Sequence, residues 1–312
     1  MECIYCKKSK ISFVDKYKIE INKDVKYLGE MSIFKCNDCE IAFCHPMPNS
    51  KELEYFYAKI YRSKNRPHYY DEFYKKYSFI DNMNLDYLSY LTTFIDFSKI
   101  NSIFDFGAGL GNLGYIIKKQ FNHINLYSCE NDENCLHVLK ERGYKNFSKL
   151  EEVNIKFDLV ISLHCLEHLS NLEPLHKLQT LINHKGYLFI EVPNGDFEKG
   201  YINRIFDSPH LLFFNKKSLE NIFKNMSLNI VNLIYSSYSI EHDIENQKAS
   251  KFIFSNQTFG NKIREIIKNL QPFFILYIGR INFTLNERDK IEWHTHGREN
   301  SRCIRGLVIK DN

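Results

Sequence analysis

The feature that most constrains the fold of this chain is a short apolar run that ends in a glycine-rich turn. Residues 103–112 read IFDFGAGLGN. Gly107 and Gly109 let the backbone turn tightly and let its amides approach a ligand, because glycine has no Cβ. Glu130 ends the next apolar run, about twenty residues further on, where a carboxylate reaches ribose hydroxyls in a doubly wound sheet. The pattern predicts a site for an adenosine-containing cofactor.

The order of elements around this turn supports the prediction. Hydrophobic patterning indicates a strand over 103–106, a helix over 112–120 and a second strand over 124–129, which places the turn and the acidic residue at strand ends. The spacing is G-x-G-x-G rather than the G-x-G-x-x-G that binds a dinucleotide pyrophosphate, so it favours S-adenosylmethionine over NAD. The alternative is a βαβ unit whose glycines only permit close packing.

Two C-x-x-C pairs near the start of the chain predict a metal centre. Their spacing is typical of two tight turns that present four thiolates to one tetrahedral zinc ion. The four ligands would be Cys3, Cys6, Cys36 and Cys39. A closed set of four cysteines leaves no open position, so the zinc would be structural. The alternatives are reduced thiols without a metal and a redox pair. Cys44 and His45 lie close by, and we assign them to the following strand.

Composition and charge exclude some classes of function. A net charge of +4 over 312 residues is too small for the concentrated basic face of a protein whose main partner is nucleic acid, so we expect no DNA partner. The first residues do not resemble a signal peptide, and no apolar run is long enough to span a bilayer. We therefore expect a cytoplasmic protein with reduced thiols, as a monomer or a homodimer.

The chain divides into three predicted parts. Residues 1–48 form the zinc-binding module, which ends at two prolines. Residues 49–100 are helical and lead into the core; Asn49 and Glu52 form a capping box that opens the first helix. Residues 101–312 form an α/β domain with a doubly wound, parallel sheet, because strands and helices alternate.

The alternation is interrupted at about 240–301. This insertion contains an amphipathic helix around 263–270 and a compact apolar run over 273–278, which we expect to pack in the core. The alternatives for the apolar run are a dimer surface and a cover over the acceptor site. A final strand over 304–310 rejoins the sheet. Before the insertion, the core elements are predicted as helix 134–142, strand 157–163, helix 172–182, strand 186–192, helix 216–226 and strand 228–235.

These motifs together resemble the class I S-adenosylmethionine-dependent methyltransferases, in particular the branch with an N-terminal four-cysteine zinc-binding segment. The resemblance runs from Cys3 to about Tyr235. It rests on the two cysteine pairs, the segment AFCHPMP, the cofactor motif FDFGAG, the strand end LYSCE, FDLVI followed by CLEH, and the later landmarks EVPN and HLLFF. The resemblance implies a Rossmann-like sheet in the order 3-2-1-4-5-7-6 with the last strand antiparallel. The expected cofactor-binding residues are Asp105, Gly107, Ala108, Gly109, Glu130 and Leu166.

The acceptor is expected from the resemblance and from the chemistry of methyl transfer. Relatives often methylate nucleotide-linked sugars or other small precursors of surface polysaccharides and natural products, which implies O-methylation of a sugar-like or phosphorylated metabolite. A hydroxyl acceptor needs a base for its proton, and histidine suits that task near neutral pH. His168 and His210 are the candidates, with Glu167 orienting a histidine or the acceptor. The alternatives are histidines that brace loops and an exposed, solvated Glu167.

Three other functions stay open at this stage. An RNA methyltransferase could use the zinc module to grip a substrate loop, but residues 192–195 read VPNG and lack the Asn/Asp-Pro-Pro-aromatic pattern for exocyclic base amines. Methylation of carbon or nitrogen in a nucleotide-linked sugar is a second alternative. A non-catalytic cofactor-binding protein is the third, and the intact glycine turn with Glu130 disfavours it.

Overall fold

The structure is a computed structural model that describes residues 1–17, 28, 30–57, 78–195, 209–236 and 303–311. The helix predicted around 263–270 and the apolar run over 273–278 lie outside the described residues. In the second part of the chain the sequence predicts helices over 51–61 and about 70–97, and residues 58–61 and 70–77 of these also lie outside the described residues.

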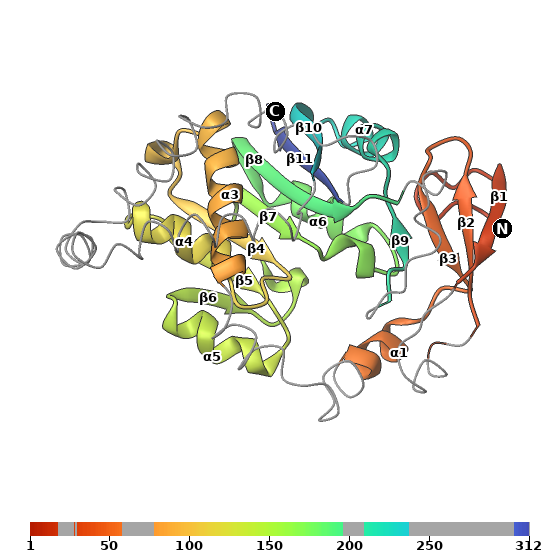
Figure 1. Ribbon diagram of the computed structural model, residues 1–312, viewed down its shortest axis with the longest axis horizontal. Coiled ribbons are helices and arrows are strands. Elements are labelled where there is room, and N and C mark those ends of the chain that lie inside the picture. Colours follow the sequence, from red (N-terminus) through yellow and green to blue (C-terminus); the bar gives the residue numbers. More distant parts are fainter. Residues whose placement is uncertain (18–27, 29, 58–77, 196–208, 237–302, 312) are drawn as a thin grey trace, which may run out of the picture.

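The central feature is a sheet of seven strands within the described residues, with helices on both faces (Figure 1). The strands are β4 (Ser102–Phe106), β5 (Asn125–Cys129), β6 (Tyr144–Phe147), β7 (Phe157–Leu163), β8 (Ile182–Pro193), β10 (Asn229–Ser236) and β11 (Cys303–Ile309). Their helices are α3 (Ser78–Phe94), α4 (Asn112–Gln120), α5 (Glu133–Glu141), α6 (Glu173–Thr180) and α7 (Lys216–Asn225). Short 3-10 turns are η3 (Phe97–Lys99), η4 (Leu150–Glu152) and η5 (Leu166–His168).

The strand order confirms the predicted topology. The strands lie in the order β6-β5-β4-β7-β8-β11-β10, which is 3-2-1-4-5-7-6 when they are numbered along the core. β4 pairs in parallel with β5 and β7, while β11 is antiparallel to both β8 and β10. The strand order reverses between β4 and β7: the chain builds the sheet outward from β4 to one side and from β7 to the other. Open α/β sheets bind ligands at such a point, beside the carboxyl ends of the two strands.

One hydrophobic core lies on each face of the seven-stranded sheet. One contains buried residues of α3, α4 and α5, such as Leu88, Ile117 and Leu139. The other contains buried residues of α6 and α7, such as Leu178 and Phe223. Each helix therefore buries one face against the sheet, and the sequence periodicity placed α4 and β7 at the bounds that the structure has.

One strand of the seven-stranded sheet was missed from the sequence. β6 is short and lies at the edge of the sheet, where Lys145 and Asn146 are exposed and only Tyr144 is buried among its four residues. Such an edge strand carries little hydrophobic signal of its own.

A second, four-stranded sheet lies at the N-terminal end of the chain. Its strands are β1 (Ile11–Lys16), β2 (Ser32–Cys36), β3 (Ala42–His45) and β9 (Leu212–Phe213). β9 comes from the segment that follows β8, and residues far apart in the chain pair, Ala42 with Phe213 and Phe43 with Leu212 (Figure 1). The predicted assignment of Cys44 and His45 to a strand is confirmed. The N-terminal sheet is thus completed by a strand from the part of the chain that follows β8.

The predicted capping box at the start of α1 (Ser50–Tyr55) is present. The Asn49 side chain accepts a hydrogen bond from the Glu52 amide at 3.0 Å, and the Glu52 carboxylate accepts one from the Asn49 amide at 2.7 Å. These bonds satisfy backbone donors that the first turn of a helix cannot pair internally. The helix therefore begins at Ser50, directly after its cap Asn49 and one residue before the predicted start at Lys51.

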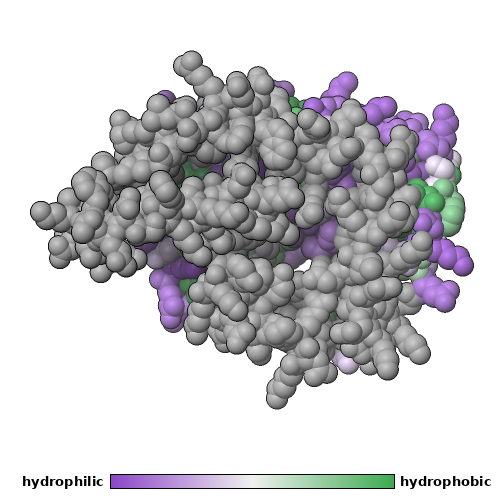
Figure 2. Space-filling view, in the orientation of Figure 1, coloured by the Kyte–Doolittle hydropathy of each residue, from purple (hydrophilic) through white to green (hydrophobic). Residues whose placement is uncertain are grey.

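The described surface is mainly hydrophilic on the face shown in Figure 2. A small hydrophobic group lies over the N-terminal sheet on this face, the part of the molecule that carries the exposed Phe13. Among the described helices, none is long and apolar enough to cross a bilayer.

The third glycine of the turn has a packing role. Gly111 has φ +65°, and a Cβ added there would lie 2.6 Å from the ring of Tyr144 and 2.7 Å from Leu139. Tyr144 donates a hydrogen bond through Oη to the Gly111 carbonyl oxygen at 2.9 Å. Gly109 also has a positive φ, +52°, but no atom lies within 4 Å of its added Cβ. The last glycine of G-x-G-x-G therefore serves the core, while Gly109 borders open space.

This difference predicts unequal costs for two alanine substitutions. Gly109→Ala should lower the free energy of unfolding by about 1 kcal/mol, the cost of a left-handed backbone with a Cβ. Gly111→Ala should lower it by roughly 2 to 4 kcal/mol, because overpacking against Tyr144 is added to the same backbone cost. Urea unfolding of both variants measures the difference, and equal losses would contradict the packing role of Gly111.

Candidate active site and metal centre

The glycine turn lies at the carboxyl end of β4 and is tied to β5. The Gly107 amide donates to the Cys129 carbonyl oxygen at 3.0 Å, and the Gly109 amide donates to Glu130 Oε2 at 2.8 Å. Both glycines have left-handed φ values, +69° and +52°. The turn therefore needs glycine for its backbone, and the open space beside Gly109 is where a ligand could approach the amides.

Glu130 is held in place by backbone amides. Besides Gly109, the amides of Asn131 and Asp132 donate to Oε1 at 2.9 and 2.8 Å. Asn146 holds the backbone on either side, since it accepts from the Glu130 amide and donates to the Glu130 carbonyl oxygen, both at 3.0 Å. A carboxylate can accept about four hydrogen bonds, so Glu130 keeps capacity for a hydroxyl donor after these three. The residues at this edge fit an adenosine-containing cofactor.

The other predicted cofactor residues differ in exposure. Asp105 is 5% exposed, and burial together with the nearby charge of Glu130 raises the pKa of its carboxyl to about 7. Ala108 is partly buried against the core on the α3–α5 face. Leu166 is completely buried, so its side chain does not reach the surface of the protein as described.

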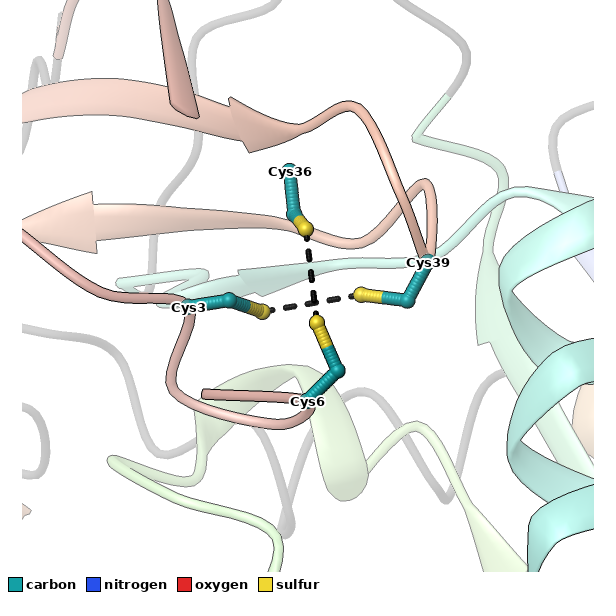
Figure 3. A group of neighbouring side chains, drawn as sticks. All are labelled: Cys3, Cys6, Cys36 and Cys39. Atoms are coloured by element: carbon teal, nitrogen blue, oxygen red, sulfur yellow. Dashed lines mark hydrogen bonds between the residues drawn. The ribbon is translucent and has the colours of Figure 1, made fainter. Parts of the chain in front are cut away.

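The four predicted zinc ligands converge on one centre (Figure 3). Cys3 Sγ and Cys39 Sγ are 3.5 Å apart, as are Cys6 Sγ and Cys36 Sγ, and the four sulfur atoms all lie within 4.8 Å of one another. These distances are far too long for disulfides. Four sulfurs bound tetrahedrally to zinc at about 2.3 Å would lie about 3.8 Å apart, so the group fits this ion.

The two cysteine pairs sit in turns of the same form. In each, the residue after the second cysteine has a left-handed backbone, with φ +60° at Lys7 and +68° at Glu40. Its amide donates to the carbonyl oxygen of the first cysteine, at 3.1 Å for Lys7 and 2.9 Å for Glu40. The chain thus forms two equivalent knuckles whose thiols face each other, which is the arrangement that a structural zinc site requires.

The three predicted acceptor-side residues come together next to the glycine turn. Glu167 and His168 lie in η5, directly after Cys165, whose Sγ would lie 2.5 Å from a Cβ added to Gly107. A carboxylate oxygen of Glu167 and one ring nitrogen from each of His168 and His210 lie within 4.8 Å of one another. The rings of His168 and His210 are 4.9 Å apart, edge to face. We call Glu167, His168 and His210 the acceptor-side cluster.

Glu167 is 2% exposed, so the alternative of a solvated carboxylate is wrong. Burial opposes its charge, but His164 and His168 lower the pKa of the carboxyl below its usual value. Oε1 is 3.7 Å from His164 Nδ1 and 3.8 Å from His168 Nε2. Glu167 therefore carries a negative charge at neutral pH inside the protein.

A buried charge network adjoins the cluster. Glu191 in β8 is fully buried and accepts hydrogen bonds from Tyr87 at 2.6 Å and from Arg305 Nε at 2.8 Å. Ser236 also donates to Glu191 at 2.9 Å, and His164 lies beside it, with Nε2 3.3 Å from Oε1. Although burial opposes protonation, the carboxylates of Glu167 and Glu191 raise the pKa of His164 to about 10. His164 thus lies between two carboxylates that favour its protonated form.

Sequence reasoning did not single out Glu191 or Arg305 for this network. Each is a charged residue within a strand whose neighbours are apolar, as in IEV and IRG. Such a residue is rarely buried without a partner of opposite charge. This pattern could have paired the two, but nothing in the sequence gives the register that sets Arg305 opposite Glu191.

A family comparison identifies the class of protein. The model of the methyltransferase domain matches residues 64–233, which include the glycine turn, Glu130 and the acceptor-side cluster. The chain belongs to the methyltransferase family. The predicted class of enzyme, an S-adenosylmethionine-dependent methyltransferase, is confirmed at this level. Assignment to the branch with a four-cysteine zinc segment stays a prediction.

Individual relatives are distant from this methyltransferase. An uncharacterized protein of Methanocaldococcus jannaschii is 26% identical over 230 residues, which cover 72% of this chain and 97% of the relative. The plantazolicin methyltransferase BpumL in complex with SAH has a TM-score of 0.44 at 15% identity, covering 73% of this chain and 82% of that one. An O-methyltransferase from a trans-AT PKS multienzyme of Brevibacillus brevis has a TM-score of 0.42 at 14% identity, covering 74% of each chain. These two structural likenesses are too distant to bear on the substrate.

The four-cysteine centre predicts a metal dependence of the N-terminal sheet. The purified methyltransferase should contain about one zinc ion, because closed thiolate sites bind zinc tightly. Cys36→Ser should remove most of that zinc and destabilise the N-terminal sheet. Cys135→Ala, which removes a buried thiol on α5 outside the centre, should keep it. Elemental analysis measures the zinc content, and a zinc-free protein prepared without chelators would contradict the assignment.

The raised pKa of Asp105 predicts a pH dependence of stability without cofactor. Because the folded pKa is about 7 and the unfolded value is 3.8, the native state keeps a proton that the unfolded chain releases. Stability from this group is complete below the unfolded pKa and is lost as pH rises through about 7. Asp105→Asn mimics the protonated form. Its free energy of unfolding, relative to that of the natural protein, should rise by roughly 3 kcal/mol between pH 4.5 and pH 8. Parallel urea-unfolding profiles for the two proteins would rule this out.

Proposed function

We propose that this methyltransferase transfers a methyl group from S-adenosylmethionine to a hydroxyl of a small polar metabolite. The observation that carries the proposal is the position of the acceptor-side cluster. Gly107 packs against Cys165, and Cys165 directly precedes the turn with Glu167 and His168. The residues proposed for the cofactor and those proposed for the acceptor are therefore neighbours at the carboxyl ends of β4 and β7, where open α/β sheets bind ligands.

The residues at the cofactor edge would have distinct tasks. Glu130 would accept hydrogen bonds from ribose hydroxyls, and Gly107 and Gly109 would let the backbone lie close to the cofactor. The cofactor supplies an activated methyl group on a sulfonium. In the transfer, the acceptor oxygen forms a bond to the methyl carbon while the carbon–sulfur bond breaks and its electron pair returns to sulfur. The leaving group is neutral, so alignment of the two reactants accounts for much of the rate.

The acceptor hydroxyl also has to lose its proton. His168 donates through Nδ1 to the Pro209 carbonyl oxygen at 2.9 Å, which fixes the ring and leaves Nε2 to act on another group. His210 lies beside it, edge to face, at 4.9 Å between ring centroids. We propose that these histidines assist the removal of the proton and that Glu167 orients them. Bracing of the 209–210 segment by His168 is part of the same arrangement.

The substrate class follows from the sequence resemblance and from charge. A sugar-like or phosphorylated precursor of surface polysaccharide or of a natural product fits the resemblance. The net charge of +4 supports a small molecule over RNA. An RNA substrate, and methylation of carbon or nitrogen in a nucleotide-linked sugar, are the alternatives that the experiment below separates.

Zinc in the four-cysteine centre would have a structural task. The four thiolates would fill its tetrahedral coordination and leave no position for a substrate. The Cys39 carbonyl oxygen accepts a hydrogen bond from Asn221 of α7 at 3.4 Å, and Cys3, Cys36 and Cys39 share the core that contains α6 and α7. We propose that the ion holds the two knuckles and, with them, the N-terminal sheet against the methyltransferase core.

Two variants should separate cofactor binding from acceptor chemistry. Glu130→Ala should weaken binding of S-adenosylhomocysteine about tenfold or more, because it removes charge-assisted hydrogen bonds and the tie to Gly109. His168→Ala should lower turnover by roughly a hundredfold while that affinity changes little. Calorimetry measures the affinities, and transfer of a labelled methyl group into a metabolite extract measures turnover.

The same labelled cofactor tests the substrate class. Label that enters structured RNA and no small-molecule fraction would overturn the proposed acceptor. Label on carbon or nitrogen of an isolated product would overturn the proposed atom. A protein that binds the cofactor but transfers no label to metabolites or RNA would be a binding protein.

A further inference from the structure

The acceptor-side cluster contains a carboxylate oxygen that the protein leaves unsatisfied. Glu167 Oε2 is buried and has no hydrogen-bond partner, and Glu167 as a whole is 2% exposed. Burying a charged oxygen without a partner costs about 1 to 3 kcal/mol or more, so it calls for a ligand, water or ion. Within the described residues, the ion-pair partners of Glu167 are two histidines, and both face Oε1.

His168 is oriented as histidines are in metal sites. Its Nδ1 donates to a backbone carbonyl oxygen, that of Pro209, at 2.9 Å. A hydrogen bond of this kind from one ring nitrogen orients the ring and presents the other nitrogen, as in histidines that bind metals. The other nitrogen, Nε2, is 3.8 Å from Glu167 Oε1.

The distances within the cluster suit a common ion. Two ligands at about 2.1 Å from one metal lie between about 3.0 Å apart at right angles and about 4.2 Å apart on opposite sides. The separation of 3.8 Å between Glu167 Oε1 and His168 Nε2 falls in this range. A ring nitrogen of His210 lies within 4.8 Å of both ligand atoms, so the three side chains offer their ligand atoms to one small region.

The backbone holds the two halves of the cluster together. The Leu211 amide donates to the Glu167 carbonyl oxygen at 2.7 Å, directly beside His210. On the far side, Cys44 donates to the His210 carbonyl oxygen through Sγ at 3.6 Å, and its amide donates to the Leu211 carbonyl oxygen at 2.9 Å. His210 is thus held from both sides at the position that completes the set with Glu167 and His168.

We propose that Glu167, His168 and His210 bind one divalent transition-metal ion. Two imidazole nitrogens and one carboxylate are ligands that zinc, iron and cobalt prefer, whereas calcium and magnesium prefer oxygen alone. Three protein ligands leave coordination positions open, unlike the closed set of four cysteines.

The catalytic use of this ion rests on the proposed function. An open coordination position would hold the acceptor hydroxyl oxygen and lower its pKa, so that its proton passes to solvent before the oxygen attacks the methyl carbon. The histidines would then assist the reaction by holding the ion. The chain would carry two metal centres of different chemistry, one with four sulfur ligands and one with nitrogen and oxygen ligands.

Cobalt titration of the intact, zinc-loaded protein tests the proposal. One equivalent of zinc fills the four thiolates, which bind it more tightly than the open three-ligand cluster. Added Co²⁺ should then bind with a stoichiometry of one and show the weak visible absorption of nitrogen and oxygen ligation, without a thiolate charge-transfer band. Glu167→Gln and His210→Ala should each weaken Co²⁺ binding at least tenfold. Two exposed residues of α5 provide matched controls, and Glu141→Gln and His137→Ala should leave Co²⁺ binding unchanged. Urea unfolding identifies any variant that fails to fold. If Glu167→Gln does not fold, His210→Ala still tests the proposal.

Two results would overturn the metal proposal. One is the absence of a second bound ion in the natural protein; the other is unchanged Co²⁺ affinity in both folded cluster variants. The outcomes are separable from those for the proposed function. Methyl transfer that persists in a chelator that spares the cysteine-bound zinc would reject the catalytic ion and leave hydroxyl methylation standing. Tight Co²⁺ binding at the cluster in a protein that methylates no hydroxyl would reject hydroxyl methylation and leave the metal site standing.

Discussion

The ion pair between Glu191 and Arg305 is the interaction on which the arrangement of this methyltransferase depends. It joins β8 to β11 at directly opposed residues, and its two partners are 114 positions apart in the chain. Tyr87 of α3 and Ser236 of β10 donate to the same carboxylate, at 2.6 and 2.9 Å. Both charges are nearly or fully buried, so removing either partner would leave an uncompensated charge, at a cost of about 3 to 5 kcal/mol.

The pair also specifies register. A one-residue slip of β11 against β8 would point Arg305 to the opposite face of the sheet and leave Glu191 without its cation. Because β11 follows residues 237–302, which lie between it and β10, its place in the sheet has to be specified by contacts of its own rather than by a short connection. The guanidinium provides this, since Arg305 also contacts Asp86 at 3.0 Å and lies over the rings of Tyr87 and Tyr90.

How much of the molecule could be predicted depended on how local each signal was. The glycine turn, α4 and β7 carry strong local patterns, and the structure places them where the sequence did. The topology came from the resemblance, because strand order depends on contacts that no local pattern contains. β6 was missed since an edge strand with two exposed polar residues has no periodicity to detect.

The candidate site shows the same limit. Glu167 and His168 are neighbours in sequence, but the burial of Glu167 arises from the return of residues 209–211 against η5 and could not be seen in advance. The cysteine pairs were clear from spacing alone, whereas the charge of His164 depends on two carboxylates brought together from η5 and β8. Sequence reasoning was therefore weakest for side chains whose environment depends on tertiary contacts.

The pairing of β3 with β9 has a consequence for how this enzyme can change in evolution. His210 lies two residues before β9, a two-residue strand. Among the described strands, β9 pairs only with β3 of the cysteine module. The N-terminal module is therefore not an appendage that can be exchanged or lost while the acceptor side stays intact. A lineage that discarded the cysteine module would have to rebuild the support of His210, while Gly109 and Glu130 would keep their mutual contacts. The segment around His210 and the N-terminal module should accordingly be inherited together, whereas the contact between Gly109 and Glu130 does not depend on either of them.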